Sequence, residues 1–174
     1  MEKEDIDFHS YIEERLIDKR ILSIRRMHNI LLLGIGEPVT TKNVDGMEII
    51  ASEVEMHIQS TWRIVNKEKN KIWLASSDFY SPSSSIKTDR NFKWYAQEMN
   101  LFDEKSHLWF DRENPIYIRD YKSTEWGDLF LYFSNGDCLE IWVDASDETE
   151  CWRIFKYNVD DIHCVITGNG LSYE

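Results

Sequence analysis

The sequence predicts an α+β fold, mainly antiparallel β, made of two duplicated β-meander halves that are each preceded by a short helix. Apolar and polar residues alternate along several short segments, as they do on a strand with one buried and one solvated face. Two further segments carry apolar residues at helical spacing, and the same order of segments occurs twice. At 174 residues the chain has the length of one ordinary domain, so we expect residues 1–174 to form a single domain.

Composition and charge exclude several classes of protein. Hydrophobic residues make up 42% and aromatic residues 13% of the chain, which is enough to form a core. The apolar runs are far shorter than the ~20 residues of a membrane-spanning helix, and residues 1–7 lack the apolar region of a signal peptide. The net charge of −12 repels phosphate backbones and anionic membranes. We therefore expect a cytoplasmic protein that binds neither nucleic acid nor membrane.

The first half begins with a short helix. Ser10 is followed three residues later by Glu13, a capping-box pattern, and helical spacing continues to about Asp18. The pattern then changes to β-type alternation, with His28-Asn29 as the turn of a hairpin and residues 81–85 as a loop. The strands predicted in this half cover residues 21–24, 30–35, 53–58, 62–65 and 72–75.

The second half repeats this order at a shift of 90 residues. Residues 62–64 and 152–154 are both Trp-Arg-Ile, and Gly46 matches Gly136, which makes residues 10–76 and 100–166 an internal pseudo-repeat. Asn135-Gly136 lies between apolar runs and predicts a tight hairpin of type I′. The elements predicted in this half are a helix over residues 101–110 and strands over 116–121, 129–133, 138–143, 151–155 and 162–166.

Three segments carry a resemblance to a known family: residues 16–26, residues 60–64, and the stretch from Gly127 through Gly136 to Phe155. They resemble a family of small uncharacterised bacterial cytosolic proteins, and the resemblance covers nearly the whole chain. It implies that each half is a β-meander ending in a Trp-Arg motif. Some members of the family look like immunity proteins encoded beside secreted toxins, so the resemblance implies a toxin-binding role and supplies no catalytic residues.

The motifs that suggest chemistry are better explained by structure. Gly34-Ile35-Gly36 lacks the third glycine and the following helix of a phosphate loop, and we expect a strand end there. The segment 168–170 is too close to the C-terminus for a phosphate site, and we expect a fraying turn. His163 and Cys164 are strand neighbours that point to opposite faces, so they cannot form a dyad.

The three cysteines, Cys138, Cys151 and Cys164, are an odd number in a chain without an export signal. We expect them to be free and buried, since no spacing typical of a zinc site accompanies them. The sequence therefore predicts no catalytic residue, no metal and no cofactor.

The two Trp-Arg pairs allow two interpretations. Neighbouring strand residues face opposite ways, so Trp62 and Trp152 are expected in the core while Arg63 and Arg153 face carboxylates of neighbouring strands. The alternative is functional: Arg63 and Arg153 together bind an anionic ligand in a pocket between the halves, because a guanidinium group suits carboxylate or phosphate.

The acidic charge is concentrated in the second half. Residues 1–87 hold 14 acidic and 12 basic side chains, whereas residues 88–174 hold 18 and 8. The segment 137–150 contains six acidic residues and no basic one. Such a segment can serve solubility, form an irregular calcium loop, or bind a basic protein. On the third interpretation the partner-binding residues are Asp144, Asp147, Glu148 and Glu150, with Trp142 as an apolar anchor.

The function predicted from the sequence is a non-enzymatic cytosolic binding protein. Within this class we expect an immunity protein that neutralises a basic toxin such as a nuclease, because nucleases hold phosphates with basic surfaces that an acidic inhibitor can occupy. The first alternative is a small-ligand-binding or regulatory module that uses Arg63 and Arg153. The second is an enzyme whose type the sequence does not reveal.

Overall fold

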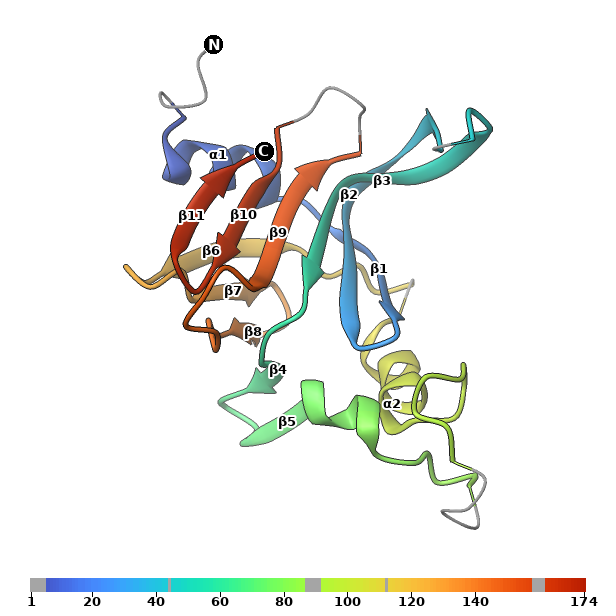
Figure 1. Ribbon diagram of the computed structural model, residues 1–174. Helices are drawn as coiled ribbons and strands as arrows, with labels where there is room; N and C mark the ends of the chain where they lie inside the picture. Colours follow the sequence, from blue (N-terminus) through green and yellow to red (C-terminus); the bar gives the residue numbers. More distant parts are fainter. Residues whose placement is uncertain (1–5, 44, 87–91, 112, 158–161) are drawn as a thin grey trace.

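The computed structural model describes residues 6–43, 45–86, 92–111, 113–157 and 162–174. Of the N-terminal stretch 1–7 considered above, residues 1–5 lie outside the described part. Within the described residues the chain forms two α-helices, a short 3-10 helix and eleven strands (Figure 1). The bounds are α1 Phe8–Leu16, β1 Ile21–Met27, β2 Ile30–Lys42, β3 Glu48–Ile58, β4 Trp62–Asn66, β5 Lys71–Ala75, η2 Ser76–Tyr80, α2 Leu101–Trp109, β6 Ile118–Ser123, β7 Leu129–Phe133, β8 Asp137–Ile141, β9 Glu150–Lys156, β10 Cys164–Thr167 and β11 Gly170–Tyr173. The α+β class with mainly antiparallel strands is confirmed.

The strands form two antiparallel sheets. One has the order β1-β2-β3-β9-β10-β11 and the other the order β5-β4-β8-β7-β6. A single cluster of buried apolar side chains takes residues from both sheets and from both α-helices. Figure 1 shows β6 and β7 lying behind the strands β9 to β11. Each sheet therefore turns one face to the core and the other outward. Among the described residues no helix is long and apolar enough to cross a membrane.

The prediction that each half closes its own meander is wrong. Strand β3 pairs with β9 and strand β4 pairs with β8, so β3 and β4 belong to different sheets. The chain leaves the first sheet after Ile58, where the backbone N–H groups of Gln59 and Ser60 both donate to the carbonyl of Cys151. These two hydrogen bonds lie where the pairing of β3 ends, and the next strand, β4, belongs to the second sheet.

The two Trp-Arg-Ile segments pair with their neighbouring strands in equivalent registers. In the six-stranded sheet Ile58 pairs with Trp152 and His57 with Arg153. In the five-stranded sheet Ile141 pairs with Trp62 and Glu140 with Arg63. Both tryptophans are fully buried, as the sequence predicted, because alternation places the Trp and Ile of each Trp-Arg-Ile segment in the core.

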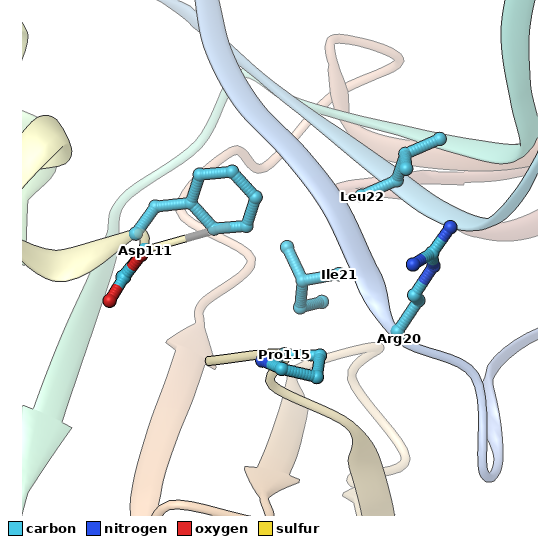
Figure 2. Close-up of a pocket in the computed structure, with 6 residues that line it drawn as sticks. Arg20, Ile21, Leu22, Asp111 and Pro115 are labelled. Carbon is cyan, nitrogen blue, oxygen red and sulfur yellow. The ribbon is translucent and has the colours of Figure 1, made fainter. Parts of the chain in front are cut away.

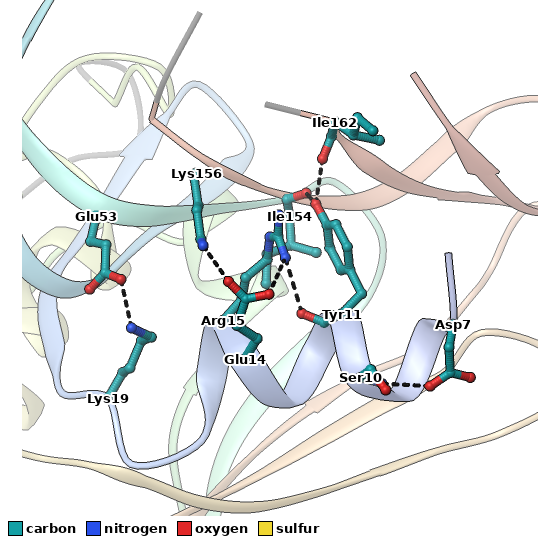
Figure 3. A network of polar contacts seen from close by, with 10 residues as sticks. All are labelled: Asp7, Ser10, Tyr11, Glu14, Arg15, Lys19, Glu53, Ile154, Lys156 and Ile162. Carbon is teal, nitrogen blue, oxygen red and sulfur yellow. Dashed lines mark hydrogen bonds and ion pairs between the residues drawn. The ribbon is translucent and has the colours of Figure 1, made fainter. Parts of the chain in front are cut away.

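Helix α1 is fixed to the six-stranded sheet by polar contacts as well as by its apolar face (Figure 3). The Tyr11 hydroxyl donates to the carbonyl oxygens of Ile154, at 3.1 Å, and Ile162, at 2.5 Å, and Lys156 donates to Glu14. The predicted capping residue is wrong: Asp7 is the N-cap and accepts from the Ser10 N–H at 2.8 Å. Because the helix starts at Phe8, Ser10 lies inside its first turn.

Asn100 is the N-cap of helix α2, and its side chain accepts from the Asp103 N–H. Arg26 of β1 anchors the helix through two hydrogen bonds of 2.7 Å to Asp103, and the Arg26 side chain is 1% exposed. At the other end of the helix, the Trp109 indole N–H donates to Asp137 at 2.9 Å. These bonds satisfy buried charges and connect α2 to one strand of each sheet.

Of two predictions about glycines, one is wrong and the other is wrong in part. Gly34-Ile35-Gly36 does not end a strand, because β2 continues to Lys42 through a register shift next to Gly36, whose φ is +85°. The turn predicted in segment 168–170 is present at residues 168–169, but it does not fray, because β11 continues from Gly170 and pairs with β10 over four residues. In both places the glycine allows a bulge or a turn within continuing β-structure.

The two predicted hairpin turns are present. Residues 28–29 connect β1 and β2, with His28 at a φ of 55°. The hairpin at Asn135-Gly136 also forms, although only Gly136 has a positive φ, 82°, so the turn is not type I′. The Gly136 N–H donates to the Phe133 carbonyl, which is the pattern of a longer turn with glycine at its left-handed position.

Candidate functional site

Arg63 and Arg153 face outward on separate sheets. Their neighbours Trp62 and Ile64, and Trp152 and Ile154, enter the core, so each arginine points to the outer face of its own sheet. The core therefore lies between the two guanidinium groups, and the structure does not bring them together. The pocket predicted between the halves has no support from this placement.

Each arginine already has carboxylate partners. The Arg63 Nε donates to Glu140 Oε2 at 2.6 Å, and its guanidinium lies 4.9 Å from the centre of the Trp142 ring. Arg153 forms a bidentate pair with Glu150 and also contacts His163 at 3.1 Å. Burial disfavours the ionised form of Glu150, yet the hydrogen bonds from Arg153 hold the pKa of Glu150 below its usual value. The structural interpretation of the Trp-Arg pairs accounts for these contacts.

Half of the predicted acidic segment has a structural role. Asp137 is buried and accepts four hydrogen bonds, from the side chains of Asn66, Trp73, Trp109 and Asn135. Glu140 is buried beside Arg63, and Glu150 is held by Arg153. A carboxylate that is occupied in this way is not available to a partner. Glu150 therefore does not share the surroundings of the other predicted partner-binding residues.

The exposed acidic residues of the segment lie in a group of loops that we call the acidic loop cluster, residues 124–128 and 142–149. The Val143 N–H donates to Asp128 Oδ1 at 2.9 Å, which ties the two segments together. Asp144 accepts from the backbone N–H and the hydroxyl of Thr61, at 2.9 and 2.5 Å. The β10–β11 turn packs against the same loop, since a Cβ on Gly168 would lie 2.4 Å from the Ala145 carbonyl oxygen.

Trp126, which sequence reasoning missed, is the apolar centre of this cluster. Its side chain is 70% exposed, an unusual state for a residue that normally buries most of its surface. The signal in the sequence is the Glu-Trp-Gly-Asp order of residues 125–128, a tryptophan placed in a turn that closes on Gly127, whose φ is +91°. By contrast, Trp142 is half-buried between Phe130 and Arg63.

The charge of the acidic loop cluster is entirely negative. It contains Glu125, Asp128, Asp144, Asp147 and Glu148, and it contains no lysine or arginine. Hydrogen bonds from the Thr149 side chain and backbone lower the pKa of Asp147 from its usual value, so this carboxyl is ionised at neutral pH. A rigid acidic surface around an exposed indole is suited to a basic protein surface.

The small pocket shown in Figure 2 is not suited to catalysis. Its volume is about 170 Å³, and it lies between β1 and the segment after α2. Its charged groups are already engaged: Arg20 pairs with Glu37 at 2.9 Å, and Asp111 accepts from Glu113 and Asn114. Packing and turn formation account for this pocket.

The cysteines are free and buried, as predicted. Burial raises the pKa of Cys138 to about 11 and that of Cys164 to about 12, so both remain protonated at neutral pH. Among the described residues, no group of three or more His, Cys, Asp or Glu side chains could hold a metal ion, which leaves the calcium interpretation of the acidic segment without a site there.

Comparison of the chain with family models, with curated proteins and with solved structures finds no match in any of the three.

Proposed function

We propose that the chain is a non-enzymatic binding protein whose acidic loop cluster docks a basic protein. The role that fits best is an immunity protein that neutralises a basic toxin such as a nuclease. The observation that carries the proposal is the exposed Trp126 among five carboxylates, with no basic residue in either segment of the cluster. The resemblance described above points to the same role.

The geometry explains how such a surface would act. Three of the five carboxylates, those of Asp128, Asp144 and Asp147, are held by backbone and hydroxyl donors, so these side chains lose little entropy when a partner binds. Long-range attraction from the acidic cluster accelerates association, and the indole supplies apolar area that slows dissociation. Charge should therefore govern the association rate, whereas Trp126 should govern the lifetime of the complex.

The experiment compares two charge variants with wild type. The binding partner is first isolated at low salt as a basic protein and identified, and association rates are then measured against ionic strength. D144N/D147N/E148Q should slow association at least about tenfold at low salt and flatten its salt dependence. The control E48Q/E68Q/E113Q removes three exposed charges elsewhere and should change the rate much less.

Glu150 is left unchanged in these variants because it is bound to Arg153. W126A should increase the dissociation rate by about tenfold or more, with little effect on association. Equal rates and salt slopes for wild type and the D144N/D147N/E148Q variant would overturn the proposal, as would a partner that is itself acidic.

We also infer that residues 10–76 and 100–166 are copies of one unit that exchange their last two strands. Trp62 and Trp152 support this inference because each pairs with an isoleucine at the equivalent position of the neighbouring strand. Gly46 and Gly136 support it as well, since both have a positive φ in corresponding hairpins. Two separately produced halves, divided in the loop at residues 81–85, should then associate one to one and recover the β-structure. Independent folding of either half as a monomer would contradict the exchange.

A further inference from the structure

A second pocket lies on the outer face of the six-stranded sheet, at the base of the β2–β3 hairpin. Its volume is about 360 Å³, within the range of small-molecule sites. Apolar walls come from Leu22, Ile49 and Ala51, and the polar side is formed by Ser23, Ser52, Arg25 and Glu55. In Figure 1 the β2–β3 hairpin and the β10–β11 turn are at opposite ends of the sheet, so this pocket is separate from the acidic loop cluster.

Glu55 is the unusual group in this pocket. Its side chain is only 5% exposed, and its Oε1 accepts from Arg25 Nη2 at 2.7 Å and from the Ser52 hydroxyl at 3.0 Å. Its Oε2 is buried and has no hydrogen-bond partner among the described residues. A buried carboxylate oxygen without a donor costs stability, and here burial raises the pKa of Glu55. The site therefore lacks a hydrogen-bond donor that a ligand could supply.

Gly34, which lies across from Glu55 on the neighbouring strand, leaves room for the polar groups of the pocket. Gly34 of β2 pairs with Ser23 of β1 and with Glu55 of β3, so the three residues form one row across the sheet. A Cβ on Gly34 would lie 2.5 Å from the hydroxyl oxygens of both Ser23 and Ser52. Only glycine at this position allows both hydroxyl groups to approach the same point.

Arg25 supplies the complementary charge. Its Nη2 is used by Glu55, while its Nη1 has no hydrogen bond among the described residues, and the side chain is 54% exposed and free to adjust. The acceptor Glu55 and the donor Arg25 thus lie side by side, joined by the 2.7 Å hydrogen bond between them. Their charges cancel, so the pocket suits a ligand that also carries one positive and one negative group a few bonds apart.

We propose that this pocket binds a free α-amino acid with an apolar side chain. Because Oε2 is closed to solvent in the unliganded chain, the Glu55 carboxylate turns this oxygen toward the pocket on binding, and the ammonium group donates to it. The ligand carboxylate accepts from Arg25 Nη1, and the ligand side chain lies against Leu22, Ile49 and Ala51. This role is independent of the acidic loop cluster and would hold whether or not that cluster binds a toxin.

The test uses three probes of the same carbon skeleton, titrated into the full chain by calorimetry or by NMR of the backbone amides. L-leucine carries both charged groups, 4-methylpentanoate lacks the ammonium group, and 3-methylbutylamine lacks the carboxylate. We expect L-leucine to bind at least about tenfold more tightly than either of the other two, since each loses one charge-assisted pair. The amide shifts should be concentrated at residues 23, 34, 52 and 55.

Two variants test which residue binds the ammonium group and which binds the carboxylate of the ligand. E55Q should bind L-leucine no better than 4-methylpentanoate, and R25M should bind it no better than 3-methylbutylamine. R119M, a control on an exposed arginine of the other sheet, should behave as wild type. If L-leucine binds no better than the two truncated probes, or if E55Q and R25M bind it as wild type does, the proposal is wrong. R25M leaves Glu55 buried without its cation, so R25K, which keeps a charge beside Glu55 but lacks the Nη1 donor, keeps the test valid if E55Q or R25M alters the fold, and it should bind L-leucine more weakly than wild type.

Discussion

The two sheets carry the same Trp-Arg-Ile segment in the same register, but the residues across from it differ on their outer faces. In the five-stranded sheet Arg63 lies across from Glu140, and the two form an ion pair at 2.6 Å. In the six-stranded sheet Arg153 lies across from His57 and takes its carboxylate from Glu150 of its own strand. On the inner faces the corresponding residues are alike, because all of them enter one core.

The outward-facing pair two residues further along each strand pair also differs between the sheets. Glu55 of β3 lies across from Phe155, whereas Cys138 of β8 lies across from Val65. Both groups are buried, but the thiol can remain neutral at little cost, while the carboxylate leaves one oxygen without a donor. Packing thus constrains the inner faces to be similar, and the outer faces are where the sheets differ in chemistry.

The largest effect is expected from removing either buried tryptophan. Trp62 and Trp152 have exposures of 1% and 0%, so W62A and W152A should each lower the free energy of unfolding by about 3–5 kcal/mol. Equilibrium unfolding in urea measures both variants under the same conditions. A loss under about 1 kcal/mol for one of them would show that the two positions are not equivalent in the core.

The second effect concerns the ion pair of the five-stranded sheet. In R63M, Glu140 stays buried with only Lys67, at 3.6 Å, as a cationic neighbour, so we expect a loss of about 2–3 kcal/mol. E140Q should cost less, about 1 kcal/mol, because Arg63 is 44% exposed and can turn to water. Urea unfolding of both variants decides this, and an equal or larger loss in E140Q would contradict the assigned burial.

The third prediction concerns the indole N–H groups of Trp62 and Trp152, which differ in their hydrogen bonding. The Trp152 N–H donates to the Gly127 carbonyl at 2.9 Å, whereas the buried Trp62 N–H has no partner among the described residues. W152F should therefore be less stable than W62F by about 1 kcal/mol, since only W152F breaks a hydrogen bond. The comparison uses the same substitution twice, so the volume change cancels. W62F as the less stable variant would contradict it.

Local signals in the sequence predicted most elements correctly, but not their pairing. Residues 129–133 were predicted as a strand with its observed bounds, and the turn at residues 28–29 was placed correctly, because alternation and turn composition act over neighbouring residues. The pairing of β3 with β9 and of β4 with β8 could not be predicted. It depends on long-range contacts such as the capture of Gln59 and Ser60 by the Cys151 carbonyl.

The candidate site was predicted in part for the same reason. The exposed acids Asp144, Asp147 and Glu148 lie together in the loops, but Glu150 is bound to Arg153, and Arg63 and Arg153 are on different sheets. A count of charges cannot distinguish a free carboxylate from a paired one. The Glu-Trp-Gly-Asp order places Trp126 in a turn, but only the structure shows that its side chain is exposed, and the Glu55 pocket depends on the pairing of Glu55 with Gly34 across two strands.

The smallest effect expected is a pH dependence that only the six-stranded sheet can show. Burial, followed by the charge of Arg153, lowers the pKa of His57 in the folded state, although Glu150 acts in the opposite direction. Arg25 and His163 also face His57 and lower its pKa further. The unfolded chain therefore binds more protons than the folded chain once the pH falls below the unfolded value of about 6.5.

It follows that wild type should lose stability relative to H57Q as the pH falls from about 8 to about 5, while the two should keep a constant difference above about pH 7.5. The measurement is urea unfolding of both proteins across this range. W62F in the other sheet is the control, because it changes no titratable group, and its difference from wild type should change little over the same interval. A gain of wild type relative to H57Q on acidification would mean that Glu150 outweighs burial and Arg153, and that His57 is stabilised in its charged form.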